Sequence, residues 1–247
     1  MLKKILLTIC IILGLSACAA SDKTISEDSP EQLYTQAKKL FDEKEYEKSA
    51  LMFDEVERQH PYSVWAARSQ IMMAYAYYQA NMYDEAVLAL DRFIQLHPGN
   101  KNTPYAYYLK GLCYFEQISD VGREQKMSAD ALETFERLVA FYPKSVYVSD
   151  AKAKIVVIYD QLAGKEMAVG RYYLKQHEFI PAINRFQTVL KEYPNTNQVP
   201  EALYRLAAAY VSLGMKESAV QINKRLNREF PDNSWTKKVN SLMKKVK

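Results

Sequence analysis

The chain has 247 residues, of which 49% are hydrophobic and 25% charged, and its formal net charge at pH 7 is +4. This composition fits a globular protein, and so small a net charge gives no broad electrostatic case for nucleic acid as a partner. The elements that the sequence predicts are taken below from the amino terminus onward.

The first 17 residues have the three parts of a secretory signal. Two lysines precede the apolar run ILLTICIIL, and small residues follow it. The run is too short to span a bilayer, which needs about 20 residues. The tetrapeptide LSAC at residues 15–18 resembles the lipobox of bacterial lipoproteins, in which the signal is cut before the cysteine and the cysteine is lipidated. The alternative is an ordinary signal peptide, cut nearby, with a chance cysteine.

A lipidated Cys18 would hold the mature chain permanently on a membrane surface. The residue after it is Ala19 rather than aspartate, and by resemblance to other lipoproteins this points to the outer membrane, on its periplasmic face. Residues 18–29 are polar and are expected to form a lipidated, flexible tether. Because Cys10 leaves with the signal at residues 1–17 and Cys18 would carry lipid, Cys113 remains alone and no intrachain disulfide is expected.

A histidine or aromatic residue followed by proline recurs along the rest of the chain. The prolines are Pro61, Pro98, Pro143, Pro194 and Pro231. If each closes a tetratricopeptide repeat of about 34 residues, small residues fall at the positions where paired helices approach closely. These residues are Ala37, Ala74, Gly111, Gly170 and Ala207 on the first helices, and Ser49, Ala86, Ala131, Ala182 and Ala219 on the second helices. The third repeat fits this register only with a polar insertion at residues 116–127.

These registers predict an all-α fold, an α-solenoid of about five tetratricopeptide repeats with a C-terminal capping helix. Residues 30–143 would hold repeats one to three, and residues 144–247 repeats four and five and the cap. Large residues are expected between the helices, at Phe53, Leu90, Phe135 and Phe186, whereas Asn223 breaks this register in the fifth repeat. Residues 145–163 have helical spacing and are expected to extend the first helix of repeat four. The cap is predicted from an apolar stripe made of Trp235, Val239, Leu242 and Val246.

Residues that could carry catalysis do not come together in the sequence. His60 and His97 occupy the slot before proline that aromatic residues fill in the other repeats, which indicates packing. No set of Cys, His or carboxylate residues has zinc-like spacing, and no nucleotide-binding, nucleophile-elbow or metalloprotease motif occurs. We therefore expect no enzyme, no catalytic or metal-binding residue and no cofactor. An enzyme would need a carboxylate pair assembled across repeats.

The predicted binding residues lie on the first helices of the first three repeats. In tetratricopeptide repeats, the fifth and twelfth positions of these helices point into the concave surface. Five of these six residues are aromatic here, against one of four in repeats four and five, so the groove should take segments rich in apolar and aromatic residues, with a carboxylate near its basic pair. The six are Tyr34, Phe41, Ile71, Tyr78, Tyr108 and Phe115, and Lys38, Arg68 and Tyr75 share their predicted face. The alternative is that the rings belong to the core, because the register could slip by one residue.

One known family shares the lipobox, the five repeats and several local runs. The repeat-three loop contains VGREQ at residues 121–125, and YPKSVYVSDAKAKI and the stretch from Arg171 to Arg185 are further shared runs. Together they resemble the BamD (ComL) lipoproteins of the β-barrel assembly machinery. In that family the loop typically has aspartate where this chain has Glu124, which is a conservative departure.

This resemblance implies a non-enzymatic component of outer-membrane protein assembly. Family members bind the POTRA region of the barrel-forming BamA subunit through their C-terminal repeats. Their N-terminal repeats are implicated in receiving the aromatic-ended targeting signal of unfolded outer-membrane proteins, and other assembly lipoproteins would be further partners. Arg185 corresponds to a basic position at the BamA-facing end and is expected to contact that partner, unless it is an ordinary surface arginine in a solvated pair. The alternative function is a generic periplasmic repeat adaptor in cell-wall synthesis or division.

Overall fold

The structure, a computed structural model, describes residues 28–118 and 126–244, and all regular secondary structure in these ranges is helical. The helices are α2 (Pro30–Asp42), α3 (Tyr46–Gln59), α4 (Val64–Gln79), α5 (Tyr83–Leu96), α6 (Thr103–Glu116), α7 (Lys126–Phe141), α8 (Val148–Lys175), α9 (Phe179–Glu192), α10 (Val199–Ser212), α11 (Lys216–Glu229) and α12 (Ser234–Lys244). The predicted signal at residues 1–17, Cys18 with the tether up to residue 27, and the VGREQ run lie outside the described residues. None of the described helices is long and apolar enough to cross a membrane.

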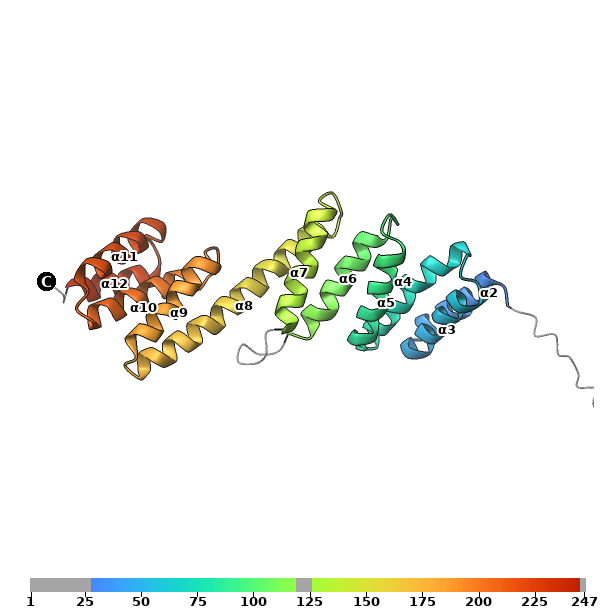
Figure 1. Cartoon of the computed structure of the whole chain (residues 1–247), viewed down its shortest axis with the longest axis horizontal. Helices are drawn as coiled ribbons and strands as arrows, with labels where there is room; N and C mark the ends of the chain where they lie inside the picture. Colours follow the sequence, from blue (N-terminus) through green and yellow to red (C-terminus); the bar gives the residue numbers. More distant parts are fainter. Residues whose placement is uncertain (1–27, 119–125, 245–247) are drawn as a thin grey trace, which may run out of the picture.

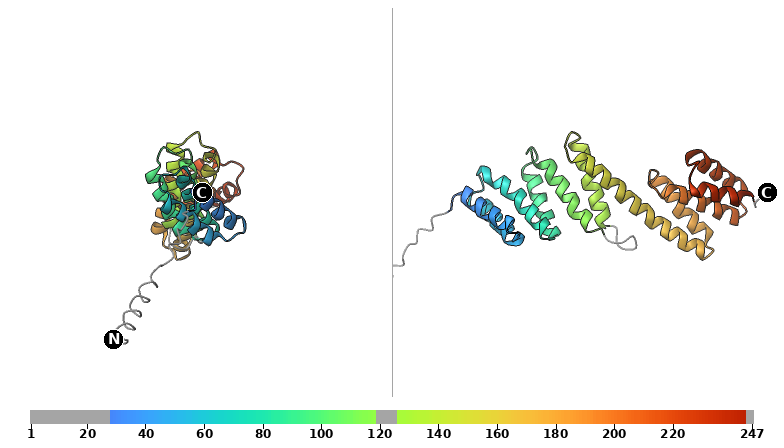
Figure 2. Two further views of the ribbon diagram at one scale, coloured as in Figure 1. Left: turned by 90° about the vertical axis from the view of Figure 1, so that its right-hand side faces the viewer. Right: turned by 180° about the vertical axis from the view of Figure 1, so that it is seen from behind.

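The helices stack side by side into an elongated solenoid. Successive helices pack against each other as antiparallel neighbours, with α2 at one end and α12 at the other (Figure 1). Seen along its long axis, the stack is narrow (Figure 2). The predicted all-α repeat architecture is therefore confirmed, with five helix pairs in the described chain followed by α12, which packs on α10 and α11 as the expected cap.

Histidine or aromatic residues before proline end the second helices. His60, His97, Tyr193 and Phe230 are the C-caps of α3, α5, α9 and α11. The residue before a proline is biased away from helical geometry, so the chain leaves the helix there. The packing role predicted for the two histidines is found at His97, whose ring lies 5.0 Å from that of Phe93. His60 has a different role, because its Nε2 donates to the Asp28 carbonyl oxygen at 2.9 Å.

Close helix contacts explain the small residues at the repeat positions. Each of the ten predicted positions is buried. At Gly111 and Gly170, an added Cβ would lie only 2.4 and 2.5 Å from the rings of Phe135 and Phe186. These two rings and the equivalent Phe53 and Leu90 are fully buried, so a large side chain from each second helix fills the space that the small residue leaves open. In the last repeat, Asn223 is only half-buried, as its departure from the register predicts.

The core is divided into three clusters along the stack, and α8 joins two of them. One cluster spans α2 to α6, the second α6 to α8, and the third α8 to α12. As predicted, α8 is one helix of 28 residues that extends the first helix of repeat four. In the cap, Trp235 and Val239 pack as expected, Met243 joins them in that cluster, and Val246 lies outside the described residues.

Glycines of α8 provide a test of this packing. Gly170→Ala should lower the free energy of unfolding by about 1 to 3 kcal/mol, because the new methyl group must displace the buried Phe186 ring. The matched control is Gly164→Ala on the same helix, where nothing lies within 4 Å of the new Cβ. That change should stabilise the protein by up to about 1 kcal/mol. Urea unfolding followed by circular dichroism measures both, and equal effects would contradict the close contact.

Candidate functional site

Aromatic rings from the first helices and from the α7–α8 turn form a strip along the first half of the solenoid, in two groups of contacting rings. We call it the aromatic strip and define it as Phe41, Tyr75, Tyr78, Tyr105, Tyr108 and Tyr147. Phe41 stacks on Tyr75 with ring centroids 5.4 Å apart, and Tyr75 stacks on Tyr78 at 6.4 Å. All of the strip's side chains are half-buried, so part of each is packed and part is accessible to a ligand.

The second part of the strip crosses from α6 to the start of α8. Tyr147 stacks on Tyr108 at 5.0 Å and lies 5.3 Å from Tyr105. The Tyr108 hydroxyl donates a hydrogen bond of 2.7 Å to Oδ2 of Asp150. The strip therefore fixes α8 to the third repeat through ring contacts and one charge-assisted hydrogen bond.

Burial raises the pKa of several phenols of the strip. It raises the pKa of Tyr78 to about 12, with a smaller contribution from the charge of Glu116. Burial, followed by the hydrogen bond to Asp150, also raises the pKa of Tyr108, and burial raises that of Tyr105 beside the neighbouring phenols. These three phenols are therefore uncharged near neutral pH, and they offer aromatic rings together with hydroxyl groups.

The two predicted basic residues differ in their surroundings, and only Lys38 lies beside a ring of the strip. Lys38 lies 6.0 Å from the Phe41 ring centroid and forms an ion pair of 2.5 Å with Asp42, so its charge is already balanced. Arg68 lies 5.1 Å from the Trp65 ring and has no carboxylate partner among the described residues. Arg68 is thus the better candidate for binding a carboxylate.

The other predicted groove residues, Tyr34, Phe115 and Ile71, differ in their contacts and in how deeply they are buried. Tyr34 packs between Phe53 and Trp65, with centroid distances of 5.2 and 4.8 Å. Phe115 is covered by the ammonium group of Lys154, 5.0 Å from the ring centroid. The placement of Ile71 in the groove is wrong, because its side chain is only 7% exposed and belongs to the core cluster of α2 to α6.

Tyr105 and Tyr147 are part of the strip but not of the groove predicted from the sequence. Tyr105 precedes Tyr108 by three residues on α6, so the helical period alone could have placed the two on one face. Tyr147 is the N-cap of α8, outside any first-helix register, and no sequence signal links it to α6.

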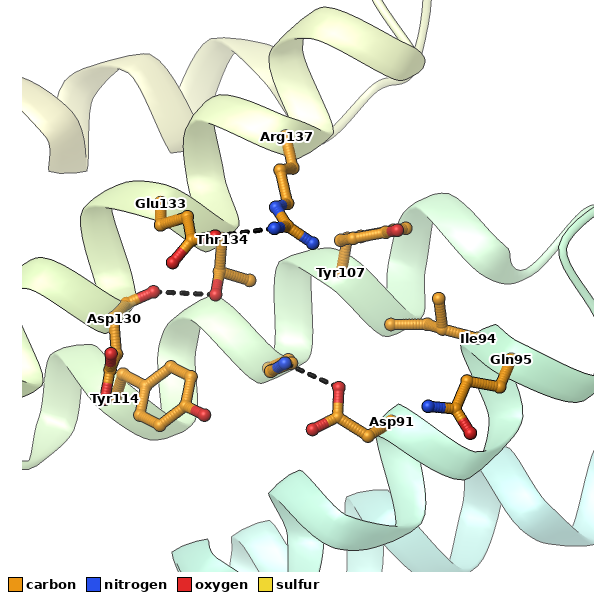
Figure 3. Close-up of a pocket in the computed structure, with 10 residues that line it drawn as sticks. Asp91, Ile94, Gln95, Tyr107, Tyr114, Asp130, Glu133, Thr134 and Arg137 are labelled. Carbon is orange, nitrogen blue, oxygen red and sulfur yellow. Dashed lines mark hydrogen bonds and ion pairs between the residues drawn. The ribbon is translucent and has the colours of Figure 1, made fainter.

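A separate polar cavity of about 300 Å³ lies between α5, α6 and α7 (Figure 3). Within it, Lys110 pairs with Asp91 at 2.5 Å and Arg137 with Glu133 at 2.6 Å. Tyr107 and Tyr114 complete its walls, and burial raises the pKa of Tyr114 to about 12. Both cations are therefore balanced by carboxylates inside the cavity, and none of its lining residues belongs to the aromatic strip.

Ion pairs connect the helices of the C-terminal half. Nη1 of Arg185 on α9 donates to Oε2 of Glu166 on α8 at 3.1 Å, and the arginine side chain is 44% exposed. Arg171 on α8 likewise pairs with Glu201 on α10 at 3.2 Å. Arg185 therefore forms an ion pair, as the alternative of an ordinary surface arginine predicts. This pair with Glu166 uses only one of the guanidinium nitrogens.

The described residues contain no group of three or more His, Cys, Asp or Glu side chains that could hold a metal ion. Cys113 is fully buried, and burial raises the pKa of its thiol to about 12. This thiol is therefore protonated near neutral pH and shielded from solvent.

The fold and the strip together define a helical-repeat scaffold with an aromatic strip on its first three repeats. Residues 26–226 match the family model YfiO, described as outer membrane lipoprotein. The outer membrane protein assembly factor BamD of Caulobacter vibrioides is 43% identical, over 91% of this chain and 74% of the relative, and that of Rickettsia prowazekii is 38% identical over 93% of each. Among solved structures, the TPR2AB domain of yeast Sti1 in complex with pHSP90 has a TM-score of 0.43 at 12% identity, over 87% of this chain and 84% of that one.

The chain belongs to the BamD/YfiO family of outer membrane lipoproteins, as its sequence features indicated. This membership makes it a non-enzymatic assembly factor of the outer membrane.

The raised phenol pKa values predict a loss of stability at alkaline pH. A phenol whose pKa rises on folding contributes stability that is full below the unfolded value of 10.0 and is lost as the pH rises toward the folded value, about 12 for Tyr78. The free energy of unfolding should therefore fall between these two pH values. Tyr78→Phe should reduce the slope, whereas Tyr62→Phe, at a fully exposed side chain, should keep it. Urea titrations at a series of pH values measure the slopes, and identical slopes in both variants would contradict the assignment.

Proposed function

We propose that the protein is anchored in the outer membrane by lipid on Cys18 and that its aromatic strip receives segments of unfolded outer-membrane proteins. The observation that carries this proposal is the strip itself, a row of half-exposed, uncharged rings on one surface. Family membership favours this role over that of an adaptor in cell-wall synthesis or division.

The chemistry of the strip suits an extended segment with aromatic side chains. Ring-on-ring contacts favour offset or edge-to-face geometry and add to the free energy gained by burying apolar area. The phenol hydroxyls can also bond to the polar backbone of such a segment. Arg68, beside Trp65, would hold a carboxylate, including the terminal carboxylate of a chain that ends in an aromatic residue.

The C-terminal half would bind the barrel-forming partner. In this proposal the partner is a BamA-like protein, contacted through its POTRA region, and Arg185 is one contact. Glu166 accepts a hydrogen bond from only one guanidinium nitrogen of Arg185, Nη1. The other guanidinium nitrogens can therefore form an ion pair with a carboxylate of the partner. Other assembly lipoproteins would join the same complex, and Cys18 would keep all of them at the membrane.

A synthetic peptide tests the strip. The double variant Tyr78→Ser and Tyr108→Ser should weaken binding of a fluorescent peptide with an aromatic C-terminal residue by at least about tenfold, because two aromatic contacts of about 1 kcal/mol each are lost. Fluorescence anisotropy measures the affinity. Tyr172→Ser is the matched control, since this tyrosine is exposed but lies on the C-terminal half of α8. Equal weakening by the control, or none by the double variant, would contradict the proposal.

Charge reversal tests the partner surface. Arg185→Glu should reduce recovery of a POTRA-bearing barrel protein in a pull-down from detergent-solubilised outer membranes, because a like charge would face the partner carboxylate. Arg137→Glu on α7 is the control, since Arg137 is also an exposed arginine in a pair with a glutamate. The proposal requires normal recovery with the control. Equal recovery with both folded variants would place the partner elsewhere.

A further inference from the structure

Three turns between successive repeats carry exposed apolar side chains along one edge of the solenoid. These turns connect α3 to α4, α5 to α6 and α7 to α8, and because successive helices are antiparallel they lie at the same edge (Figure 1). The Tyr142 hydroxyl of the third turn donates to the Pro98 carbonyl of the second at 3.3 Å, so the two are in contact. We call this feature the turn edge. Its exposed apolar side chains are Tyr62, Val64, Leu96, Phe141 and Val146.

These side chains do not contribute to the core. Tyr62 is fully exposed, and Val64 and Val146 are 82% and 84% exposed. The corresponding turns of the C-terminal half, residues 193–198 and 230–233, carry no exposed large apolar side chain. On the opposite edge of the first two repeats, the turns are Glu43-Lys44-Glu45 and Ala80-Asn81-Met82, also without one. Among these turns, the exposed apolar row lies at one edge of the first three repeats, whereas at the opposite edge of the C-terminal half Leu213 and Met215 are 38% and 43% exposed.

The charged side chains within the three turns have one sign, although the acidic residue Asp28 is bonded to the first turn through its carbonyl. Residues 60–63, 97–102 and 142–147 contain two lysines, Lys101 and Lys144, and no aspartate or glutamate. Both lysines are exposed and have no ion-pair partner among the described residues. Tyrosine and aliphatic side chains beside lysine are the combination that binds at the interface of a bilayer with anionic headgroups.

The start of the described chain is fixed to this edge. The Asp28 carbonyl accepts a hydrogen bond of 2.9 Å from His60, two residues before Tyr62. Asp28 lies only ten positions after Cys18, so the two cannot be more than about 36 Å apart in any conformation. A lipid on Cys18 would therefore hold the turn edge close to the bilayer, where even weak contacts form at high effective concentration.

We propose that the turn edge is a membrane contact surface that lies on the anionic periplasmic leaflet and orients the anchored solenoid. This inference rests on the proposed lipid anchor at Cys18. With the edge on the lipid, the solenoid would lie alongside the membrane rather than project from it. The aromatic strip, on the first helices, would then face along the leaflet surface at which barrel proteins are assembled.

Lysine footprinting tests this orientation on the native lipidated chain in vesicles of phosphatidylethanolamine and phosphatidylglycerol. Acetylation of Lys101 and Lys144 should be at least about threefold slower than for the unlipidated Cys18→Ala chain in solution, because headgroups cover them. Lys44, on the opposite edge, should react equally in both and serves as the internal control. Mass spectrometry measures each rate. The same protection without vesicles, but with other outer-membrane proteins added, would instead identify a protein partner and overturn the proposal.

Two sets of variants distinguish the contribution of the turn edge from that of the lipid anchor. Tyr62→Ser combined with Val146→Ser should abolish the protection without changing flotation of the vesicles, whereas Leu88→Ser, at an exposed leucine of α5, should preserve the protection. An unmutated chain that floats while its Lys101 and Lys144 react as fast as in solution would overturn the proposal, and so would a double variant that keeps the protection.

Attaching the chain to lipid chemically tests the turn-edge proposal separately from the proposed lipidation of Cys18. The chain from Cys18 to Lys247, which keeps every described helix, can be coupled through the Cys18 thiol to a maleimide lipid. If the native chain does not float but the coupled chain shows protected lysines, the Cys18 lipidation is wrong and the edge stands. If the coupled chain shows no protection, the edge proposal is wrong whatever the native anchor is.

Discussion

The fit of one large ring against one small residue is the contact on which the solenoid depends. At Gly111 and Gly170 even a methyl group would collide with Phe135 and Phe186, so the helix axes approach as closely as their backbones allow. Repetition of this contact sets the angle between the paired helices, and each pair then presents an apolar face to the next. The concave and convex surfaces, and the two edges with their turns, follow from this spacing. Binding residues of the first helices are thus aligned by core contacts on their opposite side.

This constraint also explains what the sequence could predict. Small residues, prolines and their spacing act within one repeat, so they determine the repeat number and the helix order, and the apolar stripe that contains Trp235 and Val239 predicts the terminal cap. The single helix α8 was predictable too, because the helical period continues through residues 145–163 without a break. The departure at Asn223 was visible for the same reason, since one polar residue stands where every other repeat has a large apolar one.

The surface was less predictable, because it depends on contacts between distant segments. Ile71 has the register position of a groove residue, but the neighbouring helices cover it. Tyr147 joins the strip only because the end of the α7–α8 turn meets α6 across about 40 residues of sequence, with Tyr108 bonded to Asp150. The balance of charge at Lys38 depends on Asp42, one turn further along the same helix. That pair could have been read from the sequence, whereas the stacking of Arg68 on Trp65 depends on side-chain rotamers.

The two surfaces proposed for binding are linked by α8. Its first turns carry Asp150, which bonds to the strip, and sixteen residues later Glu166 supports Arg185. At 1.5 Å per residue these points are about 24 Å apart on one continuous helix. The helix also belongs to two core clusters, through Ile158 in one and Met167 in the other. A displacement of its first turns by a ligand on the strip would therefore have to bend the helix or repack Met167.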